Sequence, residues 1–520
     1  MAEGDQSQSN GQSQPTLEQV LSKQRKLLDS VLSKSLASNI SILKQLYANG
    51  SDVVFFEFTL LDKLEAAIVY IDGISDIKDI DRYLLAPLRH IERNENMGWN
   101  DVLPRISISI TQTATTIQQA VDQVSAGNPV MLLDGQAAAF AFNLPSWNTR
   151  TIEEPEAETV VRGPREGFIE TLRVNTSLLR RRLHSPAFKL KPISIGRYTK
   201  TECVIAYIEG IADPTLIAEM EKRLQSIDID GVLDSSYVEE FIEDNPYSPF
   251  PQLHTTERPD VVCANLLEGR VALLIDGSPF SLIAPSTLFT MMQSPEDYYQ
   301  RSILSTFIRW LRLMLSFVAV FMPSIYVAVL SFHQEMIPTT LMLSISQSRE
   351  QIPFPALIEA LLMEITFEAL REAGIRLPKQ VGAAVSIVGA LVIGQAAIAA
   401  GIVSSPMIMV VAVTAVASFL IPNYSLGFAL RLIRFPIMLC AGFLGLYGIV
   451  LAGLFVLVHL LSLRSFGVPY LSPIAPVKTA EFKDSLIRVP RWAMNTRPHY
   501  TGSLWNKFRV RPTNSRLKKE

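Results

Sequence analysis

The feature that most constrains the fold is an uncharged stretch of 24 residues, Val381–Ser404, with the sequence VGAAVSIVGALVIGQAAIAAGIVS. A helix of this length can cross the hydrocarbon layer of a membrane, which is roughly 30 Å thick. The stretch lies in a long apolar C-terminal third, and the whole chain is 48% hydrophobic and only 19% charged. This pattern predicts a membrane protein whose N-terminal part has the composition of an ordinary globular protein.

The residues of this stretch fall on two different sides of a helix. Small residues recur at four-residue steps and predict a ridge on which another helix packs closely: Gly382, Ser386, Ala390 and Gly394. The opposite side predicts a pore-lining face: Val385, Val388, Val392, Gln395 and Ala399. An amide facing lipid would leave its donors and acceptors unsatisfied, so Gln395 indicates contact with water or protein. The alternative is an ordinary buried membrane helix whose Gln395 bonds a neighbouring helix.

A second apolar segment, Phe354–Ala373, contains several glutamates. Glu364, Glu368 and Glu372 recur at four-residue steps and share one face of a helix, which predicts a cation vestibule. The alternative is that Arg371 and Arg376 neutralise them as ion-pair partners. Because charges are costly on a lipid-facing helix, we expect this segment to be re-entrant or interfacial.

The remaining apolar segments then predict four membrane spans with both termini on the cytoplasmic side. The four are Leu313–Phe332, Val381–Val403, Pro406–Pro422 and Phe435–Leu463. Counting the acidic segment as a fifth span would place the basic tail outside, against the positive-inside tendency. From Arg464 onward the chain has twelve Lys or Arg and three acidic residues, which indicates a cytoplasmic tail attracted to anionic lipid headgroups.

The N-terminal region contains an internal repeat. AAIVYIDGISD (Ala66–Asp76) resembles CVIAYIEGIAD (Cys203–Asp213), and VMLLDG (Val130–Gly135) resembles ALLIDG (Ala272–Gly277) in the same order. Two pairs of similar segments that follow one another in the same order predict two related α/β subdomains. Each Asp-Gly pair lies between two apolar runs, so we interpret it as a hairpin turn and not as a catalytic or metal site.

Motifs for chemistry are missing from the sequence. The six histidines are dispersed, and there is no HExxH, no phosphate-binding Gly-rich loop and no GxGxxG sequence opening a helix. The three cysteines lie far apart, which fits a reducing compartment. We therefore expect no enzyme, no metal site, no cofactor and no nucleic-acid binding. The polar start MAEGDQSQSNGQSQP lacks the apolar core of a signal peptide, so the N-terminal part is expected in the cytoplasm.

These patterns predict a domain order along the chain. We expect a disordered or helical tail, a first α/β subdomain, a linker with an amphipathic helix, a second α/β subdomain, an all-α polytopic membrane domain and a basic cytoplasmic tail. Their expected ranges are 1–34, 35–147, 148–190, 191–295, 296–463 and 464–520.

Several segments together resemble the GerA family of spore germination receptors, specifically the A subunit. The most specific is RGPREGFIETLRVNTSLLRRRL (162–183), and the others are YIEGIAD (207–213), the DYYQR–RW–R run (297–312) and VPRWAMNTRP (489–498). The resemblance implies a cytoplasm-facing pair of α/β subdomains on a multi-pass domain in the spore inner membrane. It further implies a permease-like B subunit and a lipoprotein C subunit as partners. Copies of the chain would form a pentameric, nutrient-gated channel for monovalent cations. A non-conducting scaffold that couples a permease-like partner to later germination steps is the alternative.

Overall fold

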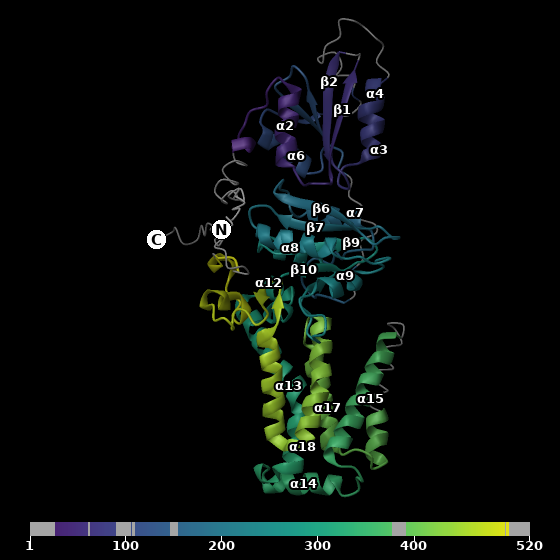
Figure 1. Cartoon of the computed structure of the whole chain (residues 1–520), viewed down its shortest axis with the longest axis vertical. Helices are drawn as coiled ribbons and strands as arrows, with labels where there is room; N and C mark the ends of the chain where they lie inside the picture. The colour runs from purple at the N-terminus through teal and green to yellow at the C-terminus, as the bar shows by residue number, and fades with distance from the viewer. Residues whose placement is uncertain are drawn as a thin grey trace, which may run out of the picture.

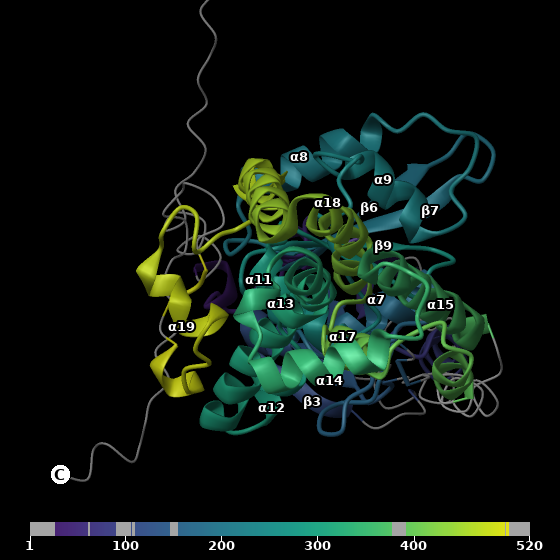
Figure 2. The ribbon, with the colours of Figure 1, turned by 90° about the horizontal axis from the view of Figure 1, so that it is seen from below.

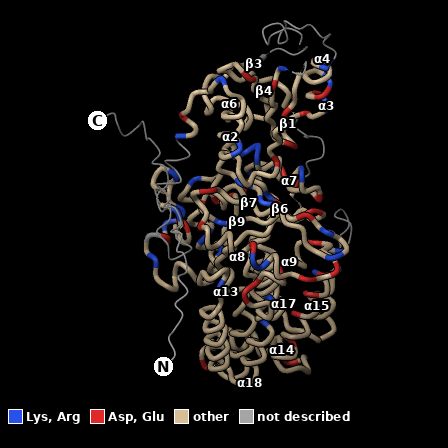
Figure 3. Tube along the Cα trace, turned by 45° about the horizontal axis from the view of Figure 1, so that its top comes forward, with Lys and Arg blue, Asp and Glu red and all other residues tan. Residues whose placement is uncertain are grey.

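The computed structural model describes residues 26–60, 63–89, 106, 110–145, 154–155, 157–376, 392–494 and 496–498. Two sheet-containing subdomains are stacked on one another, and a bundle of long helices extends from the second (Figure 1). Charged residues gather in the sheet-containing part and the C-terminal tail, whereas the helical bundle is mostly uncharged (Figure 3). An α/β N-terminal region with two sheets followed by a helical part is confirmed in this form.

The first subdomain is a five-stranded antiparallel sheet with the order β1-β2-β4-β5-β3. Its strands are β1 (Val53–Leu60), β2 (Leu64–Ile71), β3 (Ile110–Ala114), β4 (Val130–Leu133) and β5 (Ala139–Phe142). Helices α2 (Leu36–Leu46) and α6 (Ile117–Ser125) cover one face, where Val69 and Ile71 point. The other face is covered by α3 (Ile77–Asp79), the π-helix Ile80–Leu85 and α4 (Ala86–Arg89). Alternate residues of β2 thus enter two different cores, as the two-residue period of a strand requires.

The second subdomain repeats this architecture with the strand order β6-β7-β9-β10-β8. Its strands are β6 (Phe188–Ile195), β7 (Thr201–Ile208), β8 (His254–Thr256), β9 (Val271–Ile275) and β10 (Ser281–Ala284). Helices α7 (Leu172–Arg180) and α10 (Pro259–Leu267) pack on one face. Helices α8 (Pro214–Gln225) and α9 (Ser235–Ile242) pack on the other. Helix α7 lies in the segment that we expected to link the two subdomains, and it is part of the second core.

The repeated landmarks occupy equivalent places, as the duplication predicts. Tyr70 and Tyr207 are each the seventh of eight residues in the second strand of their sheet. Each Asp-Gly pair lies in the hairpin that joins the last two strands of its subdomain in chain order, β4 to β5 and β9 to β10. Both glycines have positive φ. The turn interpretation is therefore confirmed.

The two aspartates also cap helices, which the sequence analysis did not predict. Asp134 accepts a hydrogen bond from the backbone N–H of Leu36 at the start of α2, at 3.1 Å. Asp276 accepts the equivalent bond from Leu172 at the start of α7, also at 3.1 Å. A carboxylate at a helix N-terminus satisfies a donor that has no intrahelical partner. The turn thus holds the first helix of each subdomain against its sheet.

In the helical part, α13 (Ser302–Phe332) runs away from the second subdomain and α14 (Thr339–Arg349) lies across the far end (Figure 1). Helix α15 (Ala356–Arg376) contains the acidic segment and runs along the bundle beside α13, α17 (Ser405–Phe419) and α18 (Tyr424–Ser462). We expected this segment to be re-entrant or interfacial, but α14 is the helix that lies across the end. Helices α13 and α18 are long and apolar enough to cross a membrane. The number of spans stays a prediction.

Helix α18 is a hairpin and not one span. Gly445 has φ 62° and ψ −143°, so the 39-residue helix reverses in its middle, where a straight helix would be about 58 Å long. Gly445 lies against Phe332 and His333 at the far end of α13. Both ends of α18 return to the second subdomain: Asn423 lies near His254, and His459 is 2.9 Å from the Ser248 hydroxyl. We expected Phe435–Leu463 to be a single long span, which is wrong because the positive φ of a glycine turns the chain back.

Candidate functional site at the junction of the two parts

Buried ion pairs attach the first long helix to the second subdomain. Asp297, in α12 (Glu296–Tyr299), accepts hydrogen bonds from Arg309 at 2.9 Å and from Arg312 at 3.2 and 3.3 Å. Arg488 of the C-terminal tail donates to the Asp297 carbonyl at 3.2 Å. All four side chains are buried. Because ions removed from water are stable only when paired, this cluster holds α12, the start of α13 and the tail in one geometry.

The tail is also joined directly to the second sheet. Its two-residue strands β11 (Arg464–Ser465) and β12 (Val468–Pro469) follow the end of α18. The Ser465 hydroxyl donates to the Gln252 carbonyl at 2.6 Å and accepts from the Ser286 N–H at 2.9 Å. The last helix and the first helix of the bundle therefore both begin or end on the second subdomain.

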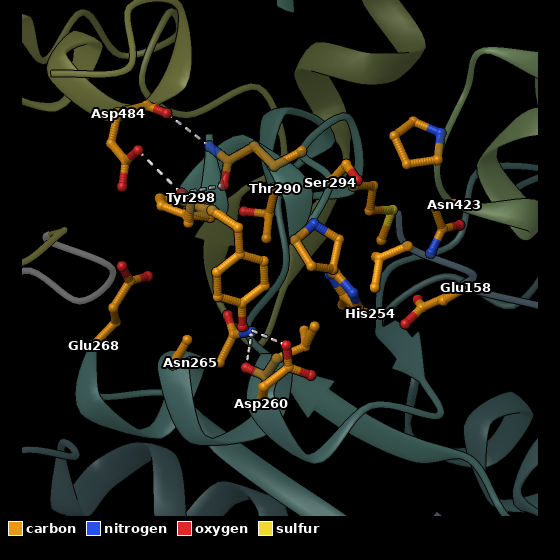
Figure 4. Close-up of a pocket in the computed structure, with 18 of the residues that line it drawn as sticks. Glu158, His254, Asp260, Asn265, Glu268, Thr290, Ser294, Tyr298, Asn423 and Asp484 are labelled. Carbon is orange, nitrogen blue, oxygen red and sulfur yellow. Dashed lines mark hydrogen bonds between the residues drawn. The ribbon is translucent and has the colours of Figure 1, made fainter. Parts of the chain in front are cut away.

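A cavity of about 460 Å³ lies at this junction (Figure 4). Its walls come from five parts of the chain: the acidic segment before α7, the β8–α10 region, residues 290–299 around α12, the loop before α18, and the tail. The polar residues that line it include Glu158, His254, Asp260, Asn265, Glu268, Thr290, Ser294, Tyr298, Asn423 and Asp484. No metal-type cluster of three His, Cys, Asp or Glu occurs within the described ranges.

Glu158 is the cavity residue whose charge depends most on pH near neutrality. Its carboxylate accepts a hydrogen bond from the Thr256 hydroxyl of β8 at 2.6 Å. Burial raises the pKa of Glu158 to about 7, although the bond from Thr256 and the charge of Arg258 act to lower it. The nearby carboxylates of Glu257 and Asp260 raise the pKa further. This carboxyl group can therefore exchange a proton when its surroundings change.

His254 is a neutral, buried imidazole on the wall of the same cavity. Burial, followed by the charge of Arg270, lowers its pKa to about 3. Its Nδ1 atom has no hydrogen-bond partner among the residues that the structure describes. An unpaired buried nitrogen costs free energy, so this atom is available to a polar group entering the cavity.

Two tyrosines of α12 line the cavity. The Tyr298 hydroxyl bonds Gln293 and Asp484, each at 3.0 Å, and so connects α12 to the tail. The Tyr299 hydroxyl bonds Asp260, which also receives a two-pronged bond from the fully buried Arg258 at 3.1 and 2.9 Å. These contacts set the spacing between α10 and α12.

Asn423 connects the cavity to the α18 hairpin. Its side-chain oxygen accepts the N–H of Leu426 at 2.9 Å and thereby caps α18, while the same residue lines the cavity. A capping residue sets where a helix begins. A change in the shape of the cavity would therefore act directly on the start of α18.

The predicted pore and packing residues are only partly described. Val385, Val388, Gly382, Ser386 and Ala390 lie outside the described residues. Within helical residues 392–399, the predicted pore-facing residues are exposed: Val392, Gln395 and Ala399. On the other side, Gly394 is buried, and a Cβ atom there would lie 3.8 Å from Ile408 of α17. The roles of the two faces stay predictions.

The predicted vestibule glutamates have arginine partners. Glu364 is fully buried and pairs with the equally buried Arg434 of α18. Glu368 lies 3.2 Å from Arg431, also of α18, and 3.9 Å from Arg371. Glu372, which is exposed, receives a hydrogen bond from Arg376 at 3.0 Å. Arg371 and Arg376 were the partners expected from the sequence, whereas Arg431 and Arg434, which come from α18, were not. The vestibule stays a prediction.

Sequence reasoning missed the junction cavity entirely. Its lining residues come from positions 157 to 497 and have no common spacing. The only available signal was the run DYYQR–RW–R, which contains Asp297, Tyr298, Tyr299 and the two arginines that pair with Asp297.

The chain has two duplicated sheets, and the second is attached to a bundle with two helices long and apolar enough to cross a membrane. These features define the class: a membrane protein with a large α/β region. Over residues 41–500 the chain matches the family described as Bacillus/Clostridium GerA spore germination protein. The chain belongs to this family, and the resemblance seen in its motifs is confirmed.

Individual relatives cover nearly the whole chain. It is 48% identical over 471 residues (90% of this chain, 92% of the relative) to "Uncharacterized membrane protein YfkQ" of Bacillus subtilis (strain 168). It is 43% identical to "Spore germination protein KA" of the same organism, covering 92% of this chain and 88% of that protein. It is 42% identical to "Spore germination protein GerLA" of Bacillus cereus, covering 84% and 89%.

A crystal structure of the N-terminal domain of the A subunit of the Bacillus megaterium spore germinant receptor GerK3 is 34% identical. The match covers 50% of this chain and 98% of that chain, with a TM-score of 0.40.

Proposed function

We propose that this chain is the A subunit of a nutrient receptor in the spore inner membrane, and that its copies assemble into a nutrient-gated channel for monovalent cations. Membership of the GerA family supports the receptor role. Buried ionisable residues between apolar helices support the channel role, because such residues are costly and commonly mark ion pathways. A permease-like B subunit, a lipoprotein C subunit, a pentameric assembly and cytoplasmic termini belong to the same proposal.

The observation that carries the gating part is the attachment of α18. Asn423 at its start lines the junction cavity, and His459 near its end contacts Ser248. A movement of the second subdomain would therefore move both arms of the hairpin together. One arm carries Arg431 and Arg434, which hold the acidic helix α15. The proposed signal thus passes from the α/β region through α18 to α15.

The alternative is a non-conducting scaffold subunit. It is favoured by the pairing of Glu364 and Glu368 within the chain, because paired carboxylates do not present a free ring of negative charge to cations.

The two functions differ in ion flux. We would reconstitute the purified receptor with its partner subunits in liposomes and record K⁺ release with and without nutrient. A channel releases K⁺ only with nutrient, and Val392→Ala, on the predicted pore face, should release it without nutrient. Gly394→Leu is the matched variant on the opposite side and should lower the assembled amount instead. No release by an intact, nutrient-binding complex would overturn the channel and leave the scaffold.

A further inference from the structure

One side of the second subdomain has large apolar side chains fully open to solvent. We define the acidic surface as the α9 region with Leu233, Tyr237, Phe241 and Tyr247, all exposed, the last by 97%. Residues 225–257 contain eight acidic residues and no Lys or Arg except Arg223's neighbours outside this range; Asp228 and Asp244 pair with Arg197 and Arg223, whereas Glu240 is exposed on α9 with the aromatic side chains.

The opposite side has a second surface of the same kind but with the other charge. We define the basic surface as the tail segment with Ile474, Val477, Ile487 and Trp492, all exposed, together with the exposed Lys483 and Arg491. Val477 is 71% exposed. Residues 474–498 contain five basic and two acidic residues, and the sequence beyond them adds more Lys and Arg.

Lipid does not account for the acidic surface. Exposed apolar residues on long membrane helices can face lipid, but α9 belongs to the sheet-containing part, and its carboxylates would be repelled by anionic headgroups. Exposed aromatic side chains that gather on one surface indicate a protein partner, and the negative charge of this surface requires that partner to be basic. The tail segment of this chain has both required properties, namely exposed apolar side chains and positive charge.

The two surfaces lie in positions that suit repeated assembly. They are at a similar height on the long axis of the molecule, just above the helical bundle, and on different sides of it (Figures 1 and 2). A surface that binds a different surface on the next copy makes a head-to-tail contact, which closes into a ring when the rotation allows it. We propose that the basic surface of one copy docks on the acidic surface of the next copy in the assembled receptor. This inference rests on the assembly of copies in the proposed function.

Each surface continues onto an apolar helix face. Next to the basic surface, Trp310 of α13 donates to the Leu486 carbonyl at 2.9 Å, and α13 exposes Phe307, Met314 and Phe317 below it. Next to the acidic surface, Ser248 contacts His459, and the returning arm of α18 exposes Val450, Leu454 and Phe455. The docked surfaces would thus bring α13 of one copy beside α18 of the next.

Cross-linking between differently tagged copies tests this contact. One copy carries Tyr247→Cys and the other Val477→Cys, each in a background with Cys440→Ala because Cys203 and Cys263 are buried. The full receptor is expressed in membranes and treated with a short bis-maleimide. We expect cross-links between the two tags only when both cysteines are present. Phe56→Cys, exposed on β1 of the first subdomain, replaces Tyr247→Cys as the control and should give none.

Charge reversal tests whether the two surfaces attract each other. Glu240→Lys should lower the cross-linked fraction about tenfold, because like charges across the contact repel. Lys483→Glu with Arg491→Glu in the second copy should restore it.

The outcomes separate this contact from its competitors and from the channel. No cross-link at normal protein levels overturns the proposed contact. So does binding of the tail surface to vesicles of anionic lipid together with an absence of cross-links, since the tail would then face lipid only. Cross-links without nutrient-triggered K⁺ release would keep the contact and overturn the channel, and release without cross-links would do the reverse.

Discussion

The two α/β subdomains have the same strand order and the same aspartate-capped first helix, but only the second is attached to the helical bundle. In the second subdomain, His254 of β8 and Asp260 of α10 line the junction cavity. The corresponding strand β3 and helix α6 of the first subdomain lie far from the bundle (Figure 1). The duplicated fold therefore explains the shape of both units, whereas the attachment arises from residues that the second unit alone carries.

The contact between the two subdomains is made by few polar groups. The buried guanidinium of Arg180, at the end of α7, donates to both carboxylate oxygens of Asp52 at 2.6 and 2.8 Å. Lys189 of β6, also buried, donates to the Leu46 carbonyl at 2.6 Å. The molecule therefore has two joints, one between the subdomains and one between the second subdomain and the bundle. A substitution can weaken either joint without changing the other.

The largest effect is expected at the bundle joint. Asp297→Asn leaves Arg312 buried without a carboxylate and Arg309 with Asp484 alone, which should lower the free energy of unfolding by about 3–5 kcal/mol. Glu57→Gln, which removes the exposed pair with Lys44 in the first subdomain, is the matched control and should cost about 0–1 kcal/mol. Thermal unfolding of the detergent-solubilised chain measures both. Similar small losses would contradict a joint held by Asp297.

The joint between the subdomains should come next. Arg180→Ala leaves Asp52 without its partner and should cost about 3 kcal/mol. The control is Arg173→Ala on the same helix, whose pair with Asp72 also joins the subdomains but is more exposed and should contribute less than about 1 kcal/mol. Limited proteolysis should cut between the subdomains faster in Arg180→Ala alone. Equal rates in the two variants would remove Arg180 from this role.

A smaller and equal effect is expected from the two helix caps. Asp134→Ala and Asp276→Ala should each cost about 1 kcal/mol, because each removes the acceptor at the start of one helix. Chemical denaturation of the two variants side by side measures the difference. Clearly unequal losses would show that the repeated aspartates are equivalent in position only.

The smallest effect is a pH dependence that the second subdomain should have because of Glu158. Its pKa is raised to about 7 in the folded chain, so the folded state favours the protonated form. This contribution to stability is complete below the unfolded pKa, near 4.5, and is lost as the pH rises through 7. Glu158→Gln should therefore raise the Tm more at pH 8 than at pH 5. A Tm difference that is the same at both pH values would argue against a buried, protonated Glu158.

Much of the fold could be predicted because its signals are local. The repeated YIDGI and YIEGI segments predicted two related units. The apolar segments predicted helices but not their paths. Phe435–Leu463 has the composition of a single span, and only the backbone of Gly445 shows that the chain turns back.

The candidate site was less predictable because its residues come together only through tertiary packing. Glu364 lies 70 positions before Arg434, and sequence spacing indicated only the arginines on its own helix. The junction cavity assembles Glu158, His254, Asn423 and Asp484, whose positions in the chain have no periodic relation.

The sequence by itself determined the duplicated α/β region, the apolar helical part, the turn residues and the GerA family. These depend on short-range patterns of polarity and backbone freedom, which each segment carries whatever its neighbours are. Only the tertiary structure decided that α18 returns, that α15 runs along the bundle with Arg434 as its partner, and that five segments of the chain enclose one cavity. A buried charge or polar group is stable only beside a partner, and the partner is chosen by three-dimensional packing, which no spacing in the chain records.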